Sequence, residues 1–95
     1  MGDEYAGPVM VVANDVTIRA DARLTGQVEP VDGRFHWGGR LAPSAELVEL
    51  VRAGARAVVL RVDGGPPCGA RLEEVDPWGG VRVAAVGSPP WTVGV

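Results

Sequence analysis

Residues 16–41 read VTIRADARLTGQVEPVDGRFHWGGRL, and this stretch decides the fold. Apolar and polar residues alternate over residues 16–28, which is the period of a half-buried β-strand. The dipeptide Asp32-Gly33 follows, and it is favoured by a tight two-residue hairpin turn that requires positive φ. The stretch therefore predicts two antiparallel strands joined by a turn at Asp32-Gly33.

Counting outward from this turn predicts the register of the hairpin. It pairs Glu29 with His36, and along the whole hairpin polar residues then face polar ones and apolar residues face apolar ones. It also places Gly26 opposite Gly39, with Gly38 beside them, which indicates a bend or bulge where the sheet curls. Strong curvature favours a small barrel or a cupped sheet.

The remaining chain predicts four more strands and one helix. Leu47, Leu50 and Val51 fall on one helical face, between a capping Ser44 and a terminating Gly54. Strands are expected over residues 8–13, 56–63, 68–75 and 81–87, with residues 1–7 a loose leader and residues 88–95 a tail packed across a sheet. The fold class is therefore mainly β (α+β), with about six antiparallel strands in a strongly curved sheet or small barrel and one short helix between the third and fourth strands.

The composition indicates one ordinary globular domain over residues 1–95, because hydrophobic residues make up 46% and charged residues 22% of the chain. With a net charge of −3 and scattered arginines, no nucleic-acid partner is expected. Its apolar runs are far shorter than the roughly 20 residues that span a bilayer, and the acidic start is unlike a secretory signal, so we expect a cytoplasmic protein without a membrane partner. Cys68 and His36 are too few for a zinc site, and no cofactor motif is present. We expect no metal and no cofactor.

Glu29 and His36 are the candidate catalytic residues. Side chains directly opposite on one face of a sheet lie about 5 Å apart at Cβ, and histidine titrates near neutral pH, so the pair would form an acid–base dyad. Arg34 and Arg40 share the His36 face and would bind an anionic group of a substrate. The other interpretation is that this face is simply the water side of the sheet.

The aromatic residues supply the candidate hydrophobic wall of such a site. Trp37 or Trp78 would contact a substrate there, although the facing of Trp37 and Phe35 favours the core. Trp78 lies in the turn Asp76-Pro77-Trp78-Gly79-Gly80 of a second hairpin. It is therefore either a lid over a pocket or part of a subunit interface.

The chain resembles a family of small actinobacterial domains of uncharacterised function. The resemblance covers nearly the whole chain and is carried by LTGQVEP (24–30), DGRFHWGGR (32–40), DPWGGVRV (76–83) and GSPPW (87–91). Members occur alone or fused to the C-terminal side of flavin-dependent monooxygenases, which implies a link to specialised small-molecule metabolism. The resemblance brings no catalytic residues with it, and Gly38 and Gly80 stand where bulkier residues are expected.

Two functions are compatible with these features. The first is a cofactor-independent small-molecule-binding protein or enzyme of actinobacterial specialised metabolism, a cyclase, isomerase or dehydratase that acts by acid–base chemistry on a small hydrophobic or anionic metabolite. The second is a non-catalytic module that forms a homodimer or docks onto a flavin-dependent monooxygenase through sheet edges and the surfaces of Trp78 and Trp91. The direction in which the Glu29 and His36 face points distinguishes them.

Overall fold

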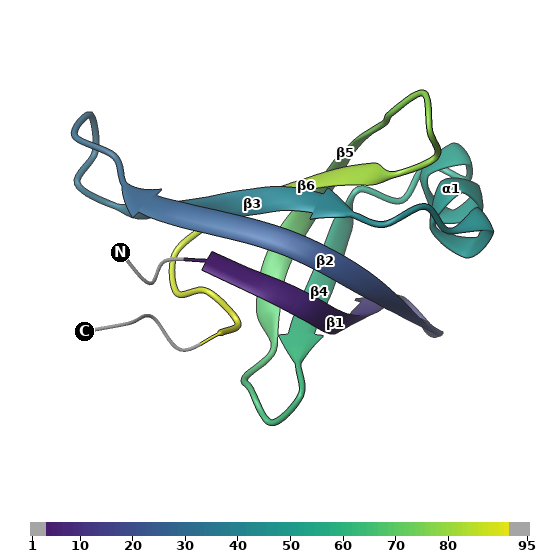
Figure 1. The fold of residues 1–95 in the computed structure, drawn as a ribbon, viewed down its shortest axis with the longest axis horizontal. Coiled ribbons are helices and arrows are strands. Elements are labelled where there is room, and N and C mark those ends of the chain that lie inside the picture. Colours follow the sequence, from purple (N-terminus) through teal and green to yellow (C-terminus); the bar gives the residue numbers. More distant parts are fainter. Residues whose placement is uncertain (1–3, 92–95) are drawn as a thin grey trace.

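Each alternating stretch of the sequence forms a strand in the computed structural model, which describes residues 4–91 (Figure 1). The elements in chain order are β1 (Glu4–Ala13), β2 (Val16–Val28), β3 (Phe35–Leu41), α1 (Ala45–Arg52), β4 (Ala57–Val62), β5 (Cys68–Val75) and β6 (Val81–Val86). All strand pairs are antiparallel, and the order β1-β2-β3-β6-β5-β4 closes into a barrel. The predicted fold class, with its helix between the third and fourth strands, is confirmed.

The barrel interior is filled by the apolar residues of the alternating pattern. On β2, for example, Ile18, Ala22 and Leu24 are all buried. The buried core consists of Val9, Val11, Ala13, Ile18, Ala22, Leu24, Trp37, Leu41, Leu47, Val58, Leu60, Val62, Leu72, Val81, Val83 and Trp91. No polar or charged side chain of the described residues is buried with them. The inside of the barrel is therefore a packed core.

The first strand begins earlier than the sequence predicts. Residues 4–7 were expected in a loose leader, but Glu4 pairs with Thr25 and Gly7 pairs with Ala22. The reason is the length of β2, whose alternation continues far enough to offer these residues a partner strand. Residues 1–3 of the predicted leader lie outside the described residues.

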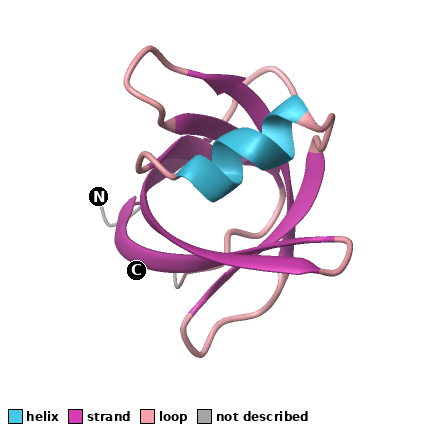
Figure 2. Ribbon diagram, turned by 90° about the vertical axis from the view of Figure 1, so that its right-hand side faces the viewer, coloured by secondary structure: helices cyan, strands magenta, loops and turns pink. Residues whose placement is uncertain are grey.

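The two ends of the barrel are covered differently. In Figure 2, α1 lies across one opening, and its Leu47 is fully buried against the core. Ser44 starts this helix, because its hydroxyl accepts the Leu47 N–H at 3.3 Å.

No helix within residues 4–91 has the length and apolar character that a membrane crossing requires.

Trp91 of the chain's tail packs at the other end of the barrel. Its ring stacks on Tyr5 at a centroid distance of 6.3 Å and meets Trp37 edge-on at 5.8 Å. The buried indole N–H groups of Trp37 and Trp91 have no hydrogen-bond acceptor among the described residues. Residues 87–91 form no strand, as expected for a tail that packs across the sheet, and residues 92–95 lie outside the described part.

Two glycines of β3 let the barrel curl tightly. A Cβ on Gly39 would lie 2.0 Å from the Arg23 carbonyl oxygen, and one on Gly38 would lie 2.4 Å from the Val83 carbonyl oxygen. Both neighbouring strands thus approach β3 more closely than a side chain permits. The predicted curl is present, but the expected facing of Gly26 and Gly39 is wrong, since Gly26 pairs with Trp37.

Candidate functional site

The hairpin between β2 and β3 has a longer turn than Asp32-Gly33 alone predicts, and its register differs by two residues. Gln27, rather than Glu29, lies opposite His36. The main chain of Glu29 instead pairs with that of Arg34, whose carbonyl accepts the Glu29 N–H at 2.9 Å. The residues between these two form the turn, in which the Gly33 N–H donates to the Glu29 carbonyl at 2.8 Å. The predicted cross-strand pairing of Glu29 with His36 is therefore wrong.

Pro30 and Asp32 explain the longer turn. The ring of Pro30 fixes φ at a value that suits the first position of a turn. Asp32 Oδ1 accepts the Arg34 N–H at 2.9 Å, which is a local bond that aspartate favours in turns. Gly33 adopts a φ of 68°, as the sequence predicts. A register shift of two residues leaves every side chain on the same face, so the alternation does not resist it.

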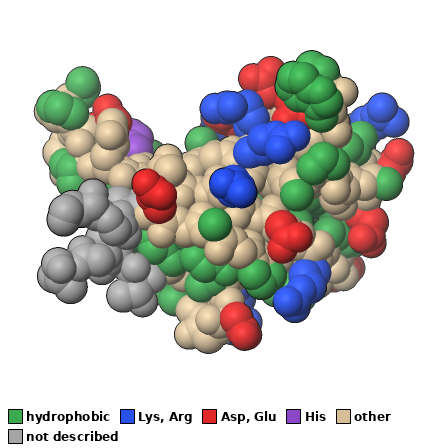
Figure 3. Space-filling model, in the orientation of Figure 1, with side chains coloured by type: hydrophobic (Ala, Val, Ile, Leu, Met, Phe, Trp, Pro, Cys, Tyr) green, Lys and Arg blue, Asp and Glu red, His purple; other side chains and the backbone are tan. Residues whose placement is uncertain are grey.

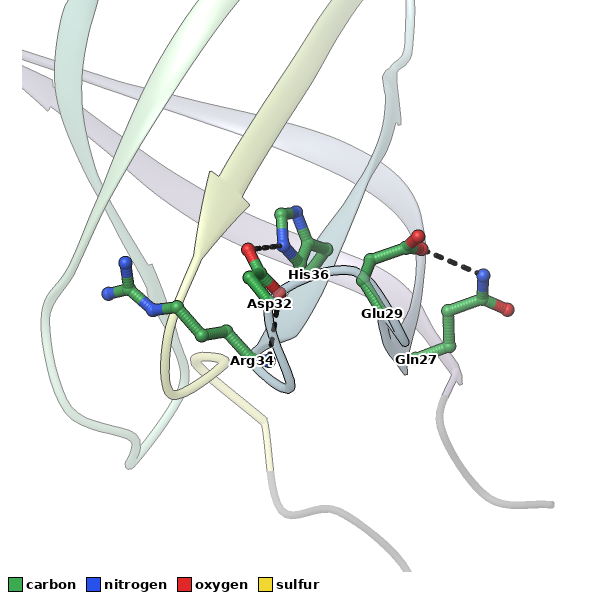
Figure 4. A network of polar contacts seen from close by, with 5 residues as sticks. All are labelled: Gln27, Glu29, Asp32, Arg34 and His36. Carbon is green, nitrogen blue, oxygen red and sulfur yellow. Dashed lines mark hydrogen bonds and ion pairs between the residues drawn. The ribbon is translucent and has the colours of Figure 1, made fainter.

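Asp32 is the carboxylate partner of His36 in this hairpin (Figure 4). Its Oδ2 lies 2.9 Å from His36 Nε2, and both side chains are partly exposed. The backbone N–H of Arg34, and after it the His36 contact, hold the pKa of Asp32 below its usual value. The Glu29 carboxylate instead accepts a hydrogen bond from Gln27 Nε2 at 2.9 Å. Sequence reasoning missed Asp32, although its position four residues before His36 across a turn was the available signal.

The candidate substrate residues of this hairpin point in different directions. The Arg34 guanidinium extends away from Asp32 and His36, so only its main chain joins their network (Figure 4). Trp37 points into the barrel and is 3% exposed. Because neighbouring residues of a strand point to opposite faces, His36 and Arg40 lie on the outside of the barrel. The polar face of the hairpin is thus an outer surface. This agrees with the second interpretation of the sequence, in which that face is the water side of the sheet.

Arg40 lies at the opposite end of β3 from His36, and Trp78 lies in the β5–β6 loop that Arg40 contacts through Asp76. Arg40 Nε pairs with Asp76 Oδ2, and Asp76 Oδ1 accepts the N–H groups of Trp78 and Gly80 at 2.9 Å each. Arg40 is the main reason why the pKa of Asp76 is lowered to about 2, and in return Asp76 raises the pKa of Arg40. Arg40 therefore supports the β5–β6 loop. The predicted binding residues do not converge on one site.

The two glycines that depart from the expected family pattern are both explained by close contacts. A Cβ at Gly80 would lie 2.6 Å from the Arg40 guanidinium, and Gly38 meets the main chain of β6 as described above. The absence of a side chain at Gly80 thus makes room for the Arg40–Asp76 pair. Trp78 lines neither the groove described below nor two smaller pockets of the described residues.

A groove of about 880 Å³ is lined by residues of β2, β3, β5 and β6. His36 lies at its border, and Figure 3 shows a hollow between this histidine, in purple, and a group of blue arginines. The lining residues are Thr25, Gly26, Gln27, His36, Trp37, Gly38, Gly39, Gly69, Ala70, Arg71, Glu73, Arg82, Val83, Ala84, Ala85 and Val86. This groove is larger than two further pockets of the described residues, which have volumes of about 280 and 40 Å³.

The described residues contain no group of three or more His, Cys, Asp or Glu side chains placed to hold a metal ion. Cys68 is partly buried, and its burial raises the pKa of the thiol. A raised pKa disfavours the thiolate that nucleophilic chemistry needs. Cys68 therefore behaves as a small core-side residue, as the sequence indicates.

Comparison with known proteins places the chain among uncharacterised relatives. A family model described as "Domain of unknown function (DUF4873)" matches residues 2–93. Three uncharacterised proteins, one from Mycobacterium bovis and two from strains of Mycobacterium tuberculosis, are each 39% identical over 87 residues. The match covers 92% of this chain but only 24% of each relative. No solved structure matches the chain.

Proposed function

Since the chain belongs to the DUF4873 family, and spans about a quarter of the length of its mycobacterial relatives, we propose that it is a docking module rather than an enzyme. The expected partner is a flavin-dependent monooxygenase, which follows from the resemblance noted in the sequence. In fused members this partner would be the preceding part of the same chain. The packed barrel interior supports the proposal, because the core cluster occupies the space that an enclosed active site would need.

Trp78 is the observation that carries the proposal. Its side chain is 78% exposed, at the tip of the β5–β6 loop. Asp76 holds this loop through its contacts with Arg40, Trp78 and Gly80, so the indole is presented on a preorganised backbone. Tryptophan is one of the residues enriched among the energetic hot spots of protein interfaces. A loop of this kind fits a partner with an apolar pocket for the ring.

Calorimetric titration of the chain with the flavin-dependent monooxygenase encoded nearest to it in its genome tests the proposal. We expect Trp78→Ala to weaken binding by about 30-fold or more, because removing an anchor typically costs about 2 kcal/mol or more. Its effect on the free energy of unfolding should stay within about 0.5 kcal/mol, as for other exposed positions. Val31→Ala is the matched control, since Val31 is 95% exposed in the β2–β3 loop at the other end of the barrel.

Two outcomes would overturn this proposal. One is that Trp78→Ala binds the monooxygenase as tightly as the parent chain does. The other is that sedimentation of the parent chain alone shows a homodimer that Trp78→Ala dissociates, because the ring would then be occupied by a second copy. Loss of binding in Trp78→Ala, with retention in Val31→Ala, supports the docking module.

A second candidate function is favoured by the 2.9 Å contact between Asp32 and His36 at the border of the groove. A carboxylate that orients a histidine is an arrangement used in acid–base catalysis, and the groove could admit a small metabolite for cyclisation, isomerisation or dehydration. Ring opening of 5-nitrobenzisoxazole, which reports proton abstraction, tests it. The expected result is a rate per histidine above that of free imidazole at the same pH, lost in His36→Gln and lowered in Asp32→Asn. A rate no higher than that of imidazole rules this function out.

A further inference from the structure

The ladder between β5 and β6 is incomplete. These strands pair at Arg71 with Ala84, at Leu72 with Val83 and again at Val75 with Val81. Beyond the Arg71–Ala84 pair, the two strands diverge. The β5 segment 69–70 pairs only with β4, and the β6 segment 85–86 pairs only with β3. In Figure 1, β6 continues beside β3 while β5 turns away along β4. The barrel wall therefore opens between these two segments.

Main-chain groups of β6 face this opening. The Gly87 N–H donates to the Phe35 carbonyl at 2.8 Å, so this residue of the β6 edge directs its hydrogen bond toward β3. Because hydrogen-bonding directions alternate along an antiparallel strand, the main chain of Val86 is directed to the β5 side. Val86 has no partner there in the β5–β6 ladder. An unpaired strand edge of this kind is a template for another strand.

The groove of about 880 Å³ lies over the same opening, and both diverging segments line it. On the β5 side, a Cβ added to Gly69 would meet no atom within 4 Å, so space is free above that strand. On the β6 side, Ala84 lines the groove with a small side chain, while Ala85 packs against the core. The residues beside the free edge thus leave room for an extended main chain to approach.

The charge of the groove selects for an acidic occupant. Arg71 and Arg82 line it, and neither forms an ion pair with a carboxylate of the described residues. Glu73 is the acidic residue among the lining side chains, so the two arginines outweigh it. This positive surface stands out in a chain whose net charge is −3. Arginine forks are suited to bidentate binding of carboxylates.

We propose that this groove binds an extended acidic peptide segment of a partner protein as an added β-strand. The peptide's main chain pairs with the free edge at Val86, and its carboxylates pair with Arg71 and Arg82. A small anion would use the arginines alone, whereas an extended peptide also satisfies the unpaired main chain. The site goes beyond the docking surface at Trp78, because it uses other strands and a different partner chemistry.

Titration of the isotope-labelled chain with a peptide that alternates valine and glutamate tests the proposal. Amide shifts in nuclear magnetic resonance spectra should concentrate at residues 69–71 and 84–86. We expect Arg71→Ala combined with Arg82→Ala to weaken binding about tenfold or more, and more so at low salt. Arg61→Ala is the matched control, since Arg61 is an exposed arginine of β4 outside the groove. A valine–lysine peptide should not bind.

Three further measurements make the proposal falsifiable. A peptide N-methylated at alternate residues should bind much more weakly, and equal binding would overturn strand addition. Inorganic phosphate should compete poorly, and full displacement of the peptide by millimolar phosphate would show a simple anion site instead. Trp78→Ala should bind the peptide as the parent does. Loss of peptide binding in that variant would place the peptide on the Trp78 surface and overturn the groove, so the two proposals fail separately.

Discussion

Asp76 is the residue on which the β5–β6 loop depends. Its carboxylate is 16% exposed and accepts hydrogen bonds from the main chain of Trp78 and Gly80, while Arg40 reaches it from β3. The Asp76 side chain thereby connects the β5–β6 loop, which presents Trp78, to the wall of the barrel. The neighbouring Gly80 leaves the space that the Arg40 guanidinium occupies.

Asp76→Asn removes the charge of this group and keeps its shape. The pKa of about 2 in the folded chain lies below the unfolded value of about 3.9, so the carboxylate stabilises the fold above about pH 4. That stabilisation is lost as the pH falls toward about 2. We therefore expect the variant to unfold at lower urea concentration than the parent at about pH 6, with the difference closing near pH 2. Tryptophan fluorescence during urea unfolding measures it.

Asp15→Asn, in the turn between β1 and β2, controls for the loss of one negative charge in the preceding experiment. It should reproduce the parent's dependence of unfolding on pH. If the difference between the parent and Asp76→Asn stays constant down to about pH 2, the Arg40–Asp76 pair does not stabilise the fold in the way described.

At the scale of elements, the β2–β3 hairpin carries the site's geometry. Its turn places the Asp32 carboxylate against His36 and the Glu29 carboxylate against the Gln27 amide. The loop depends on Gly33, whose φ of 68° lies in the left-handed region. An alternative two-residue turn would have put Glu29 opposite His36 and left Asp32 at the tip.

Gly33→Ala tests this element. An L-residue in the left-handed region costs about 1–2 kcal/mol, so the free energy of unfolding should fall by about that amount. Gly33→Asn is the matched variant, and it should cost less because asparagine tolerates this conformation. Urea midpoints of the two variants give the comparison. Equal destabilisation by alanine and asparagine would show that the turn does not need this φ.

At the scale of the whole molecule, the closed barrel leaves its candidate binding surfaces on the outside. The core cluster fills the interior, α1 covers one end, and Trp91 packs at the other. Trp78 and the groove of Arg71 and Arg82 are then separate outer surfaces. A compact barrel with two such surfaces suits a domain that makes up about a quarter of longer relatives.

The amino-acid sequence by itself determined the number and order of the strands and the place of the helix, although β1 begins four residues before the strand predicted over residues 8–13. Alternation, proline and glycine act over a few residues, so the bounds of β2 agree with the prediction, and Trp37 is found in the core that its facing favours. These properties depend on residues that are neighbours in the chain, so the sequence alone predicts them.

Only the tertiary structure decided the register, the partner of His36 and the separation of the candidate residues. A shift of two residues changes no facing, so the alternation allowed either Glu29 or Gln27 opposite His36. The pairing of β6 with β3 likewise joins segments far apart in the chain. β5 is next to β6 in the chain, but it pairs with β6 only as far as Arg71 and Ala84, which opens the wall beside Val86. Contacts between distant segments depend on how the whole barrel closes, which no local pattern encodes.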